Sequence, residues 1–134
     1  MSVIVTDAGF GPDTWTAPIT ALEDARDGVG IDLPSSFDPL ELAGRLPQID
    51  MIRIDFPNSA DGRGFTIARQ LRLMGYQGRL RARGHVIADQ YAMARRAGFD
   101  EVEINSDLAN RQPQAQWLYR ADWQAHDYQT RLRG

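Results

Sequence analysis

Apolar and polar residues alternate in three short segments of the chain, at residues 49–56, 79–82 and 101–104. Alternation with a period of two is typical of β-strands, because successive side chains point to opposite faces of a sheet. Each of these segments therefore predicts a strand. Two further apolar runs, at residues 2–6 and 29–33, predict two more.

Helices are expected between these strands. Residues 35–46 predict a short helix with Asp38 as its N-cap and Pro39 at the first helical position, where proline is favoured. Residues 65–74 and residues 86–97 predict two longer helices. Because strands and helices alternate over short links, the sequence predicts βα units and a mainly parallel sheet.

The two ends of the chain have less regular patterns. The glycine- and proline-containing stretch at residues 7–15 is expected to be a loop. Residues 108–133 predict a C-terminal helical tail that is broken near Pro113. The residues expected to dock this tail are Trp117, Leu118, Trp123 and Tyr128.

One face of the predicted strands is charged. Its side chains are Arg53, Asp55, Arg79, Arg81, Arg83, Glu101 and Glu103. Strands covered by helices on both faces would instead be continuously apolar. We therefore expect an α/β fold with all helices on one face of the sheet, resembling a half or partial β/α barrel. Arg79 and Arg81 are expected to pair with Glu101 and Glu103 across neighbouring strands.

The composition fits one α/β domain over residues 1–134, since 134 residues with 43% hydrophobic content suit one core. The sequence has no cysteine, and all 15 basic residues are arginine, which excludes thiol, disulfide and lysine-dependent chemistry. It shows no signal peptide or membrane-spanning run, so we expect a cytoplasmic protein without membrane contact. No metal site, cofactor motif or catalytic constellation is recognisable, which leaves open whether the protein is an enzyme.

Charge is unevenly distributed along the chain. The formal net charge is −3, but residues 69–96 carry +6 and the remaining residues −9. The overall acidity argues against nucleic-acid binding. The basic segment has two interpretations, a solvated arginine-rich surface or a site for an anion or an acidic partner.

Several polar residues fall where predicted strands lead into helices. Asp55 and Asp61 flank one such loop, where β/α folds place their chemistry, although a capping role for Asp61 is an equal alternative. Arg81, Arg83 and Gly84 precede the predicted helix 86–97. Two guanidinium groups and free N–H groups at the helix start predict a site for a small oxyanion.

Five motifs together carry a family resemblance. They are "FP" (56–57), "DGR" (61–63), "ARQLR" (68–72), "GRLRARGHVIADQ" (78–90) and "RAGFD" (96–100). The combination resembles the bacterial family of domain of unknown function 934 (DUF934), with the firmest match at about residues 50–104. The chain departs from the family pattern at Ala97, where many members have cysteine, and at His85, where an acid is common.

The resemblance implies a role beside assimilatory sulfite reductase, in sulfate assimilation and cysteine biosynthesis. Its motifs supply the candidate functional residues Asp61, Arg63, Arg69, Arg81, Asp89 and Gln90. A second similarity, of residues 81–102 to a strand–helix unit of EAL-type phosphodiesterases, favours barrel-like geometry. Arg83 stands where those enzymes place a metal-binding glutamate, which argues against their reaction.

We therefore expect an accessory or regulatory protein of sulfite reduction that acts by binding. One alternative is a small enzyme of the same pathway, of the oxidoreductase type, that handles an oxyanion with Asp61, Arg63, Arg81, Asp89 and Gln90. Another is a degenerate β/α-barrel domain that senses a metabolite. The expected partners are sulfite reductase or a small oxyanion, with a homo-oligomer as a further possibility and no cofactor.

Overall fold

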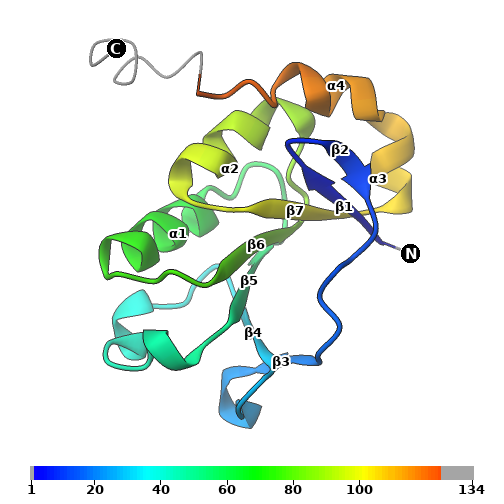
Figure 1. Ribbon diagram of the computed structural model, residues 1–134. Coiled ribbons are helices and arrows are strands. Elements are labelled where there is room, and N and C mark those ends of the chain that lie inside the picture. The colour runs from blue at the N-terminus through cyan, green and yellow to red at the C-terminus, as the bar shows by residue number, and fades with distance from the viewer. Residues whose placement is uncertain (1, 125–134) are drawn as a thin grey trace.

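A single seven-stranded sheet forms the centre of the computed structural model, which describes residues 2–124. The strands are β1 (Ser2–Thr6), β2 (Gly9–Gly11), β3 (Ile19–Ala21), β4 (Gly30–Leu33), β5 (Met51–Phe56), β6 (Arg79–Gly84) and β7 (Glu101–Asn105). Their spatial order is β2-β1-β7-β6-β5-β4-β3 (Figure 1). Strands β3 to β7 are parallel, whereas β1 runs antiparallel to β7 and to β2. The protein is therefore a mixed α/β domain with a mostly parallel sheet.

The α-helices follow the later strands. They are α1 (Arg63–Leu73), α2 (Tyr91–Ala97), α3 (Ser106–Arg111) and α4 (Gln114–Tyr119). Short 3-10 helices occupy Leu22–Asp24, Pro39–Leu42, Leu46–Gln48 and Ala88–Gln90. Because β5, β6 and β7 are neighbours in chain order, right-handed crossovers place α1 and α2 on the same face of the sheet. The two helices lie next to each other there (Figure 1).

The apolar face of the sheet packs against these helices. Ile54, Leu80 and Val102 belong to one buried hydrophobic cluster with Leu71 of α1 and Ala94 of α2. The side chains of this cluster are close to fully buried, so their burial supplies the main driving force for folding. The core thus fixes the positions of β5, β6 and β7, whose other face carries the charged side chains.

The charged face is approached by the link between β2 and β3. Asp13 in this link accepts hydrogen bonds from Arg81, and Thr14 Oγ1 accepts one from Arg79. The expected pairing across the ladder is observed, since Arg79 and Arg81 both contact Glu101. The N-terminal third of the chain therefore contributes directly to the charged face.

Some local expectations were wrong. The stretch expected to be a loop contains β2, which pairs with β1. The helix expected at 35–46 is two 3-10 helices, although Asp38 caps the first through Leu40 N–H. Gly44, at φ +82°, breaks the segment between them. Ile19–Ala21, a short edge strand, was not expected at all.

The expected tail is also partly different. Trp117 of α4 is buried and packs edge-on against Tyr91, and Pro113 immediately precedes α4, where the break was expected. Leu118 is 41% exposed, so it does not dock as expected. Tyr128 and the rest of the predicted tail lie outside the described residues.

Candidate functional site

A network of ion pairs is centred on Arg81, on the charged face of β6. Arg81 Nε lies 2.5 Å from Glu101 Oε2, Nη1 lies 2.8 Å from Glu103 Oε1, and Nη2 lies 2.7 Å from Asp13 Oδ1. The Arg81 side chain is fully buried. Burial disfavours its charged form, but the hydrogen bonds to Asp13 and the charge of Glu101 outweigh burial and raise the pKa of Arg81.

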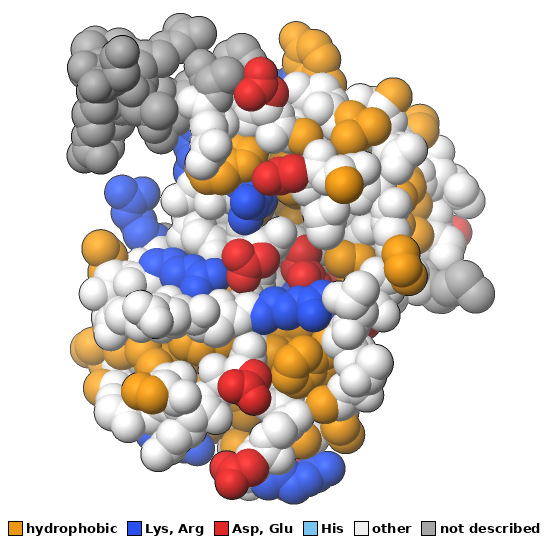
Figure 2. Space-filling view, viewed as in Figure 1, with side chains coloured by type: hydrophobic (Ala, Val, Ile, Leu, Met, Phe, Trp, Pro, Cys, Tyr) orange, Lys and Arg blue, Asp and Glu red, His pale blue; other side chains and the backbone are white. Residues whose placement is uncertain are grey.

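The network continues onto the neighbouring strands. Arg53 on β5 forms a bidentate pair with Asp32 on β4, at 2.6 and 2.7 Å, and reaches Glu103 at 3.1 Å. Arg79 pairs with Glu101 at 2.7 Å. Basic and acidic side chains also lie beside each other across the middle of the molecule in Figure 2. The arginines of β5 and β6 thus neutralise the carboxylates of β4 and β7.

Arg83 lies at the end of this network and has longer contacts than the other arginines. Its Nη1 is 3.6 Å from Asp55 Oδ1 and its Nε is 3.6 Å from Glu103 Oε2, and its side chain is 49% exposed. These residues line a pocket of about 330 Å³ at the carboxyl ends of β5, β6 and β7. Its lining also includes Ser2, Phe56, Pro57, Gly84, His85, Ile104 and Asn105. We call this hollow the edge pocket.

Two of the backbone donors expected for an anion site are already used. The N–H of Ile87 donates to Gln90 Oε1 at 3.1 Å, and the N–H of Ala88 donates to Gln112 Oε1 at 2.6 Å. Residues 88–90 form a 3-10 turn before α2 begins at Tyr91. Of the expected oxyanion ligands, Arg81 is enclosed by carboxylates, whereas Arg83 beside Gly84 faces an open pocket.

Asp61 and Arg63 tie the loop that leads into α1. Arg63 Nη2 donates to Asp61 Oδ2 at 2.8 Å and to Ser35 Oγ at 2.9 Å. Asp61 Oδ1 also accepts a hydrogen bond from the Arg63 N–H. The Arg63 side chain and backbone hydrogen bonds hold the pKa of Asp61 well below its usual range. Asp61 is therefore a carboxylate that anchors a loop.

Asp89 and Gln90 have separate partners. Asp89 Oδ1 lies 3.1 Å from Arg120 Nη2, near α4. Gln90 Nε2 donates to the Ser59 carbonyl at 2.8 Å, so it ties the loop after β5 to the start of α2. Within residues 2–124, no hydrogen bond or ion pair joins Asp61 or Arg63 to Arg81, Asp89 or Gln90.

Arg69 lies on the outer side of α1. Together with Phe65, Met93 and Arg96 it lines a groove of about 340 Å³ between α1 and α2, and we call these four residues the α1–α2 surface. Met93 is 52% exposed. Within the described part of the chain, neither Arg69 nor Arg96 lies within ion-pair distance of a carboxylate. Arg96 donates one hydrogen bond, to the Trp123 carbonyl at 3.2 Å.

Sequence reasoning missed several of these residues. Asp13 lies in a stretch expected to be a loop, and nothing in its local pattern indicates a contact with Arg81. Asp32 and Arg53 also pair across neighbouring strands, and this pair was not predicted. Met93 and Arg96 occupy one helical face with an exposed apolar residue beside an arginine, a signal that the sequence does contain.

The fold and the network define an α/β protein with an ion-paired sheet face and an open pocket at the strand ends. Among residues 2–124, no cluster of three or more His, Asp or Glu side chains suitable for a metal is found, and no helix there is long and apolar enough to cross a membrane. The family model for bacterial proteins of unknown function, DUF934, matches residues 30–134, so the chain belongs to this family. Comparison with curated proteins found no match.

Proposed function

We propose that this protein is an accessory or regulatory protein of assimilatory sulfite reduction, and that it acts by binding. The pathway rests on the resemblance to a family whose members are met beside sulfite reductase. The mode of action rests on one observation, the α1–α2 surface. There, two arginines without a carboxylate partner in the described chain flank the exposed Met93.

The internal contacts of the other candidates support binding over catalysis. Arg81 is held by three carboxylates, and Asp61 is held by Arg63. A general acid or base needs a pKa near the working pH and access to a substrate. The low pKa of Asp61 and the burial of Arg81 make both groups poor candidates for proton transfer.

The chemistry of the α1–α2 surface suits an acidic protein surface. Arginine is enriched at protein interfaces because its planar guanidinium forms bidentate pairs with carboxylates and stacks on aromatic rings. Phe65 and Met93 add apolar area between the two arginines. We therefore propose that sulfite reductase offers carboxylates to Arg69 and Arg96.

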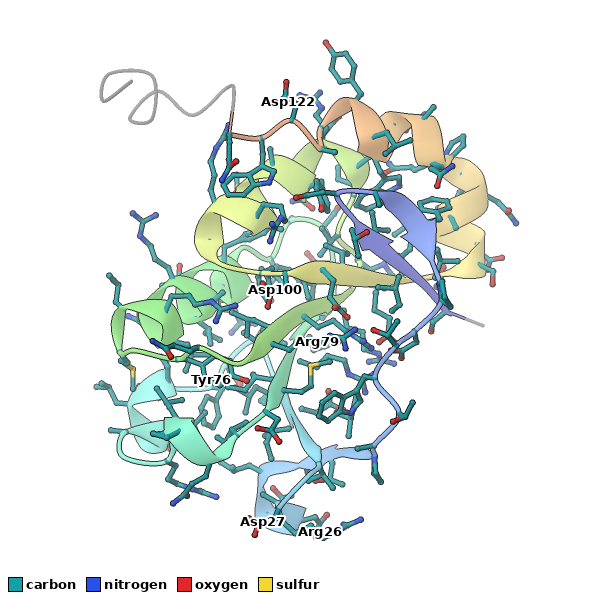
Figure 3. The ribbon with its side chains drawn as sticks, viewed as in Figure 1. Arg26, Asp27, Tyr76, Arg79, Asp100 and Asp122 are labelled. Carbon is teal, nitrogen blue, oxygen red and sulfur yellow. The ribbon has the colours of Figure 1, made fainter. Side chains whose placement is uncertain are left out.

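The test measures binding of purified sulfite reductase from the same organism by calorimetry at two salt concentrations. The Arg69→Glu/Arg96→Glu variant should bind at least about tenfold more weakly than wild type, because two attractive charges become repulsive. Arg26→Glu is the matched control, because Arg26 lies beyond β3, far from α1 and α2 (Figure 3). Equal binding by all three proteins, or no binding by wild type, would refute the proposal.

A second candidate function uses the edge pocket. An enzyme that handles an oxyanion would hold it with Arg83, which is half exposed and has only long contacts. If the protein is such an enzyme, the purified protein should turn over sulfite or a related anion when a redox partner is present. Absence of turnover together with reductase binding would favour the accessory role.

We further propose that the fold is a partial β/α barrel. Two features support this architecture: β3 to β7 are parallel and adjacent in chain order, and α1 and α2 share a face. The edge pocket then corresponds to the carboxyl end of the strands, where such barrels bind ligands. A metabolite-sensing domain is the alternative function that this architecture favours.

A further inference from the structure

We propose that the edge pocket binds a small zwitterion that carries an ammonium group beside a carboxylate, the chemistry of an α-amino acid. Asp55 would receive the ammonium group, and Arg83 would receive the carboxylate. This site is separate from the α1–α2 surface, so it does not depend on the proposed partner.

Arg83 and Asp55 have unused hydrogen-bonding capacity. A guanidinium has five N–H donors, yet Arg83 donates no hydrogen bond to any described residue. Asp55 likewise accepts none in the described chain, although its side chain is 45% exposed at the pocket. By contrast, Arg81 on the same strand face forms contacts of 2.5 to 2.8 Å with three carboxylates.

The free charges of the edge pocket have both signs. Glu103 is already paired with Arg81 and Arg53, so Arg83 and Asp55 are the half-exposed charged groups that can meet a ligand. An inorganic anion would gain Arg83 but would meet repulsion from Asp55. A simple cation would leave Arg83 unsatisfied. A ligand with both charges close together complements both groups.

The edge pocket has a volume of about 330 Å³, which suits a molecule the size of an amino acid. Gly84 has φ +116°, and a Cβ there would lie 2.6 Å from the Phe56 carbonyl oxygen, so this part of the lining is backbone in close contact with backbone. The exposed His85 also lines the pocket.

The experiment is calorimetric titration of the full chain at low salt with L-alanine, L-serine and L-cysteine. Two probes remove one charge each from L-serine: ethanolamine lacks the carboxylate, and 3-hydroxypropanoate lacks the ammonium group. At least one amino acid should bind, and both single-charge probes should bind about tenfold more weakly or not at all, because each loses a charge-assisted contact. Sulfite and sulfate are titrated as the competing anions.

Two substitutions assign the contacts. Arg83→Gln and Asp55→Asn should each weaken amino-acid binding by about tenfold or more. Arg26→Gln and Asp107→Asn, at exposed positions outside the pocket, should bind as wild type does. Circular dichroism confirms that each variant is folded.

Three outcomes would overturn the inference. The first is that wild type binds no amino acid. The second is that the Arg83→Gln and Asp55→Asn variants bind amino acids as tightly as wild type does. The third is that wild type binds sulfite at least as tightly as the best amino acid. None of them affects the partner-binding test, which uses Arg69 and Arg96.

Discussion

Arg81 and Arg83 project from the same face of β6, but their surroundings differ completely. Arg81 is fully buried and held by Asp13, Glu101 and Glu103 at 2.5 to 2.8 Å. Arg83 is 49% exposed, and its nearest carboxylates are 3.6 Å away. Arg81, in the middle of the sheet, is thus structural, whereas Arg83, at the carboxyl end of the same strand, is available to a ligand.

The difference arises from what covers each position. The link after β2 brings Asp13 over Arg81 and closes the network there. At Arg83 the strand reaches Gly84 and ends, and the residues on either side line the edge pocket. The position along β6 therefore decides which arginine has hydrogen-bond donors left for a ligand.

Replacing Arg81 should have the largest effect. Arg81→Ala leaves Glu101 and Glu103 buried without their main counter-charge, although Arg53 and Arg79 remain. Loss of one partner of a buried pair costs about 3–5 kcal/mol of unfolding free energy. Urea denaturation measures this change, with Arg26→Ala as an exposed control. A loss below about 1 kcal/mol would show that the network does not depend on Arg81.

The end of β6 should be the next most sensitive position. Gly84→Ala forces a side chain onto a backbone at φ +116° and onto the Phe56 carbonyl. The expected loss is about 1–3 kcal/mol, from strain and close contact. Gly11→Ala is the matched control, because nothing lies within 4 Å of a Cβ there. Equal stability of both variants would mean that the strand end adapts to a side chain.

Replacing Gln90 should lower stability by a smaller amount, because its side chain holds two loop segments together. Gln90→Ala removes the acceptor of the Ile87 N–H and the donor to the Ser59 carbonyl. A lost cap costs about 1 kcal/mol, so the melting temperature should fall by a few degrees. Gln70→Ala, exposed on α1, serves as the control. If Gln90→Ala melts like wild type but fails to complement a sulfite-reduction defect, Gln90 has a functional role instead.

Asp13 should give the smallest effect, visible as pH dependence. Hydrogen bonds from Arg81 lower the pKa of Asp13 from its usual 3.8. A carboxylate with a lowered pKa stabilises the folded state above its unfolded pKa, and this contribution is lost as pH falls through the folded value. Because the Asp13 side chain is 43% exposed, we expect less than about 1 kcal/mol.

The measurement compares urea denaturation of wild type and Asp13→Asn between pH 7 and pH 2. Wild type should be the more stable protein at pH 7, and the difference should shrink below about pH 4. A difference that stays constant over this range would show that the charge of Asp13 does not hold Arg81.

The sequence predicted the central strands of the sheet better than the edge strands and the short helices. The alternation in β5, β6 and β7 identified the charged face, because burial of one face imposes a period of two. The edge strands β2 and β3 were missed, since three residues are too few to show a pattern. Residues 35–46 satisfied the capping rule at Asp38, yet Gly44 limited them to short 3-10 turns.

The candidate site was less accessible from sequence. Pairing of Arg79 and Arg81 with Glu101 followed from strand adjacency and was confirmed. The contact of Arg81 with Asp13 joins residues far apart in the chain, so no local pattern predicts it. The anion site expected at Arg81, Arg83 and Gly84 stays a prediction. The N–H groups of Ile87 and Ala88 donate to Gln90 and to the distant Gln112, which the sequence analysis did not predict.

We infer that Arg83, unlike Arg81, is available to a ligand and adds little to stability. The most direct test measures urea denaturation and amino-acid titration on one preparation of Arg83→Ala. We predict an unfolding free energy within about 0.5 kcal/mol of wild type, as for an exposed ion pair, and binding weakened about tenfold or more. A stability loss like that of Arg81→Ala, with amino-acid binding unchanged, would contradict the account.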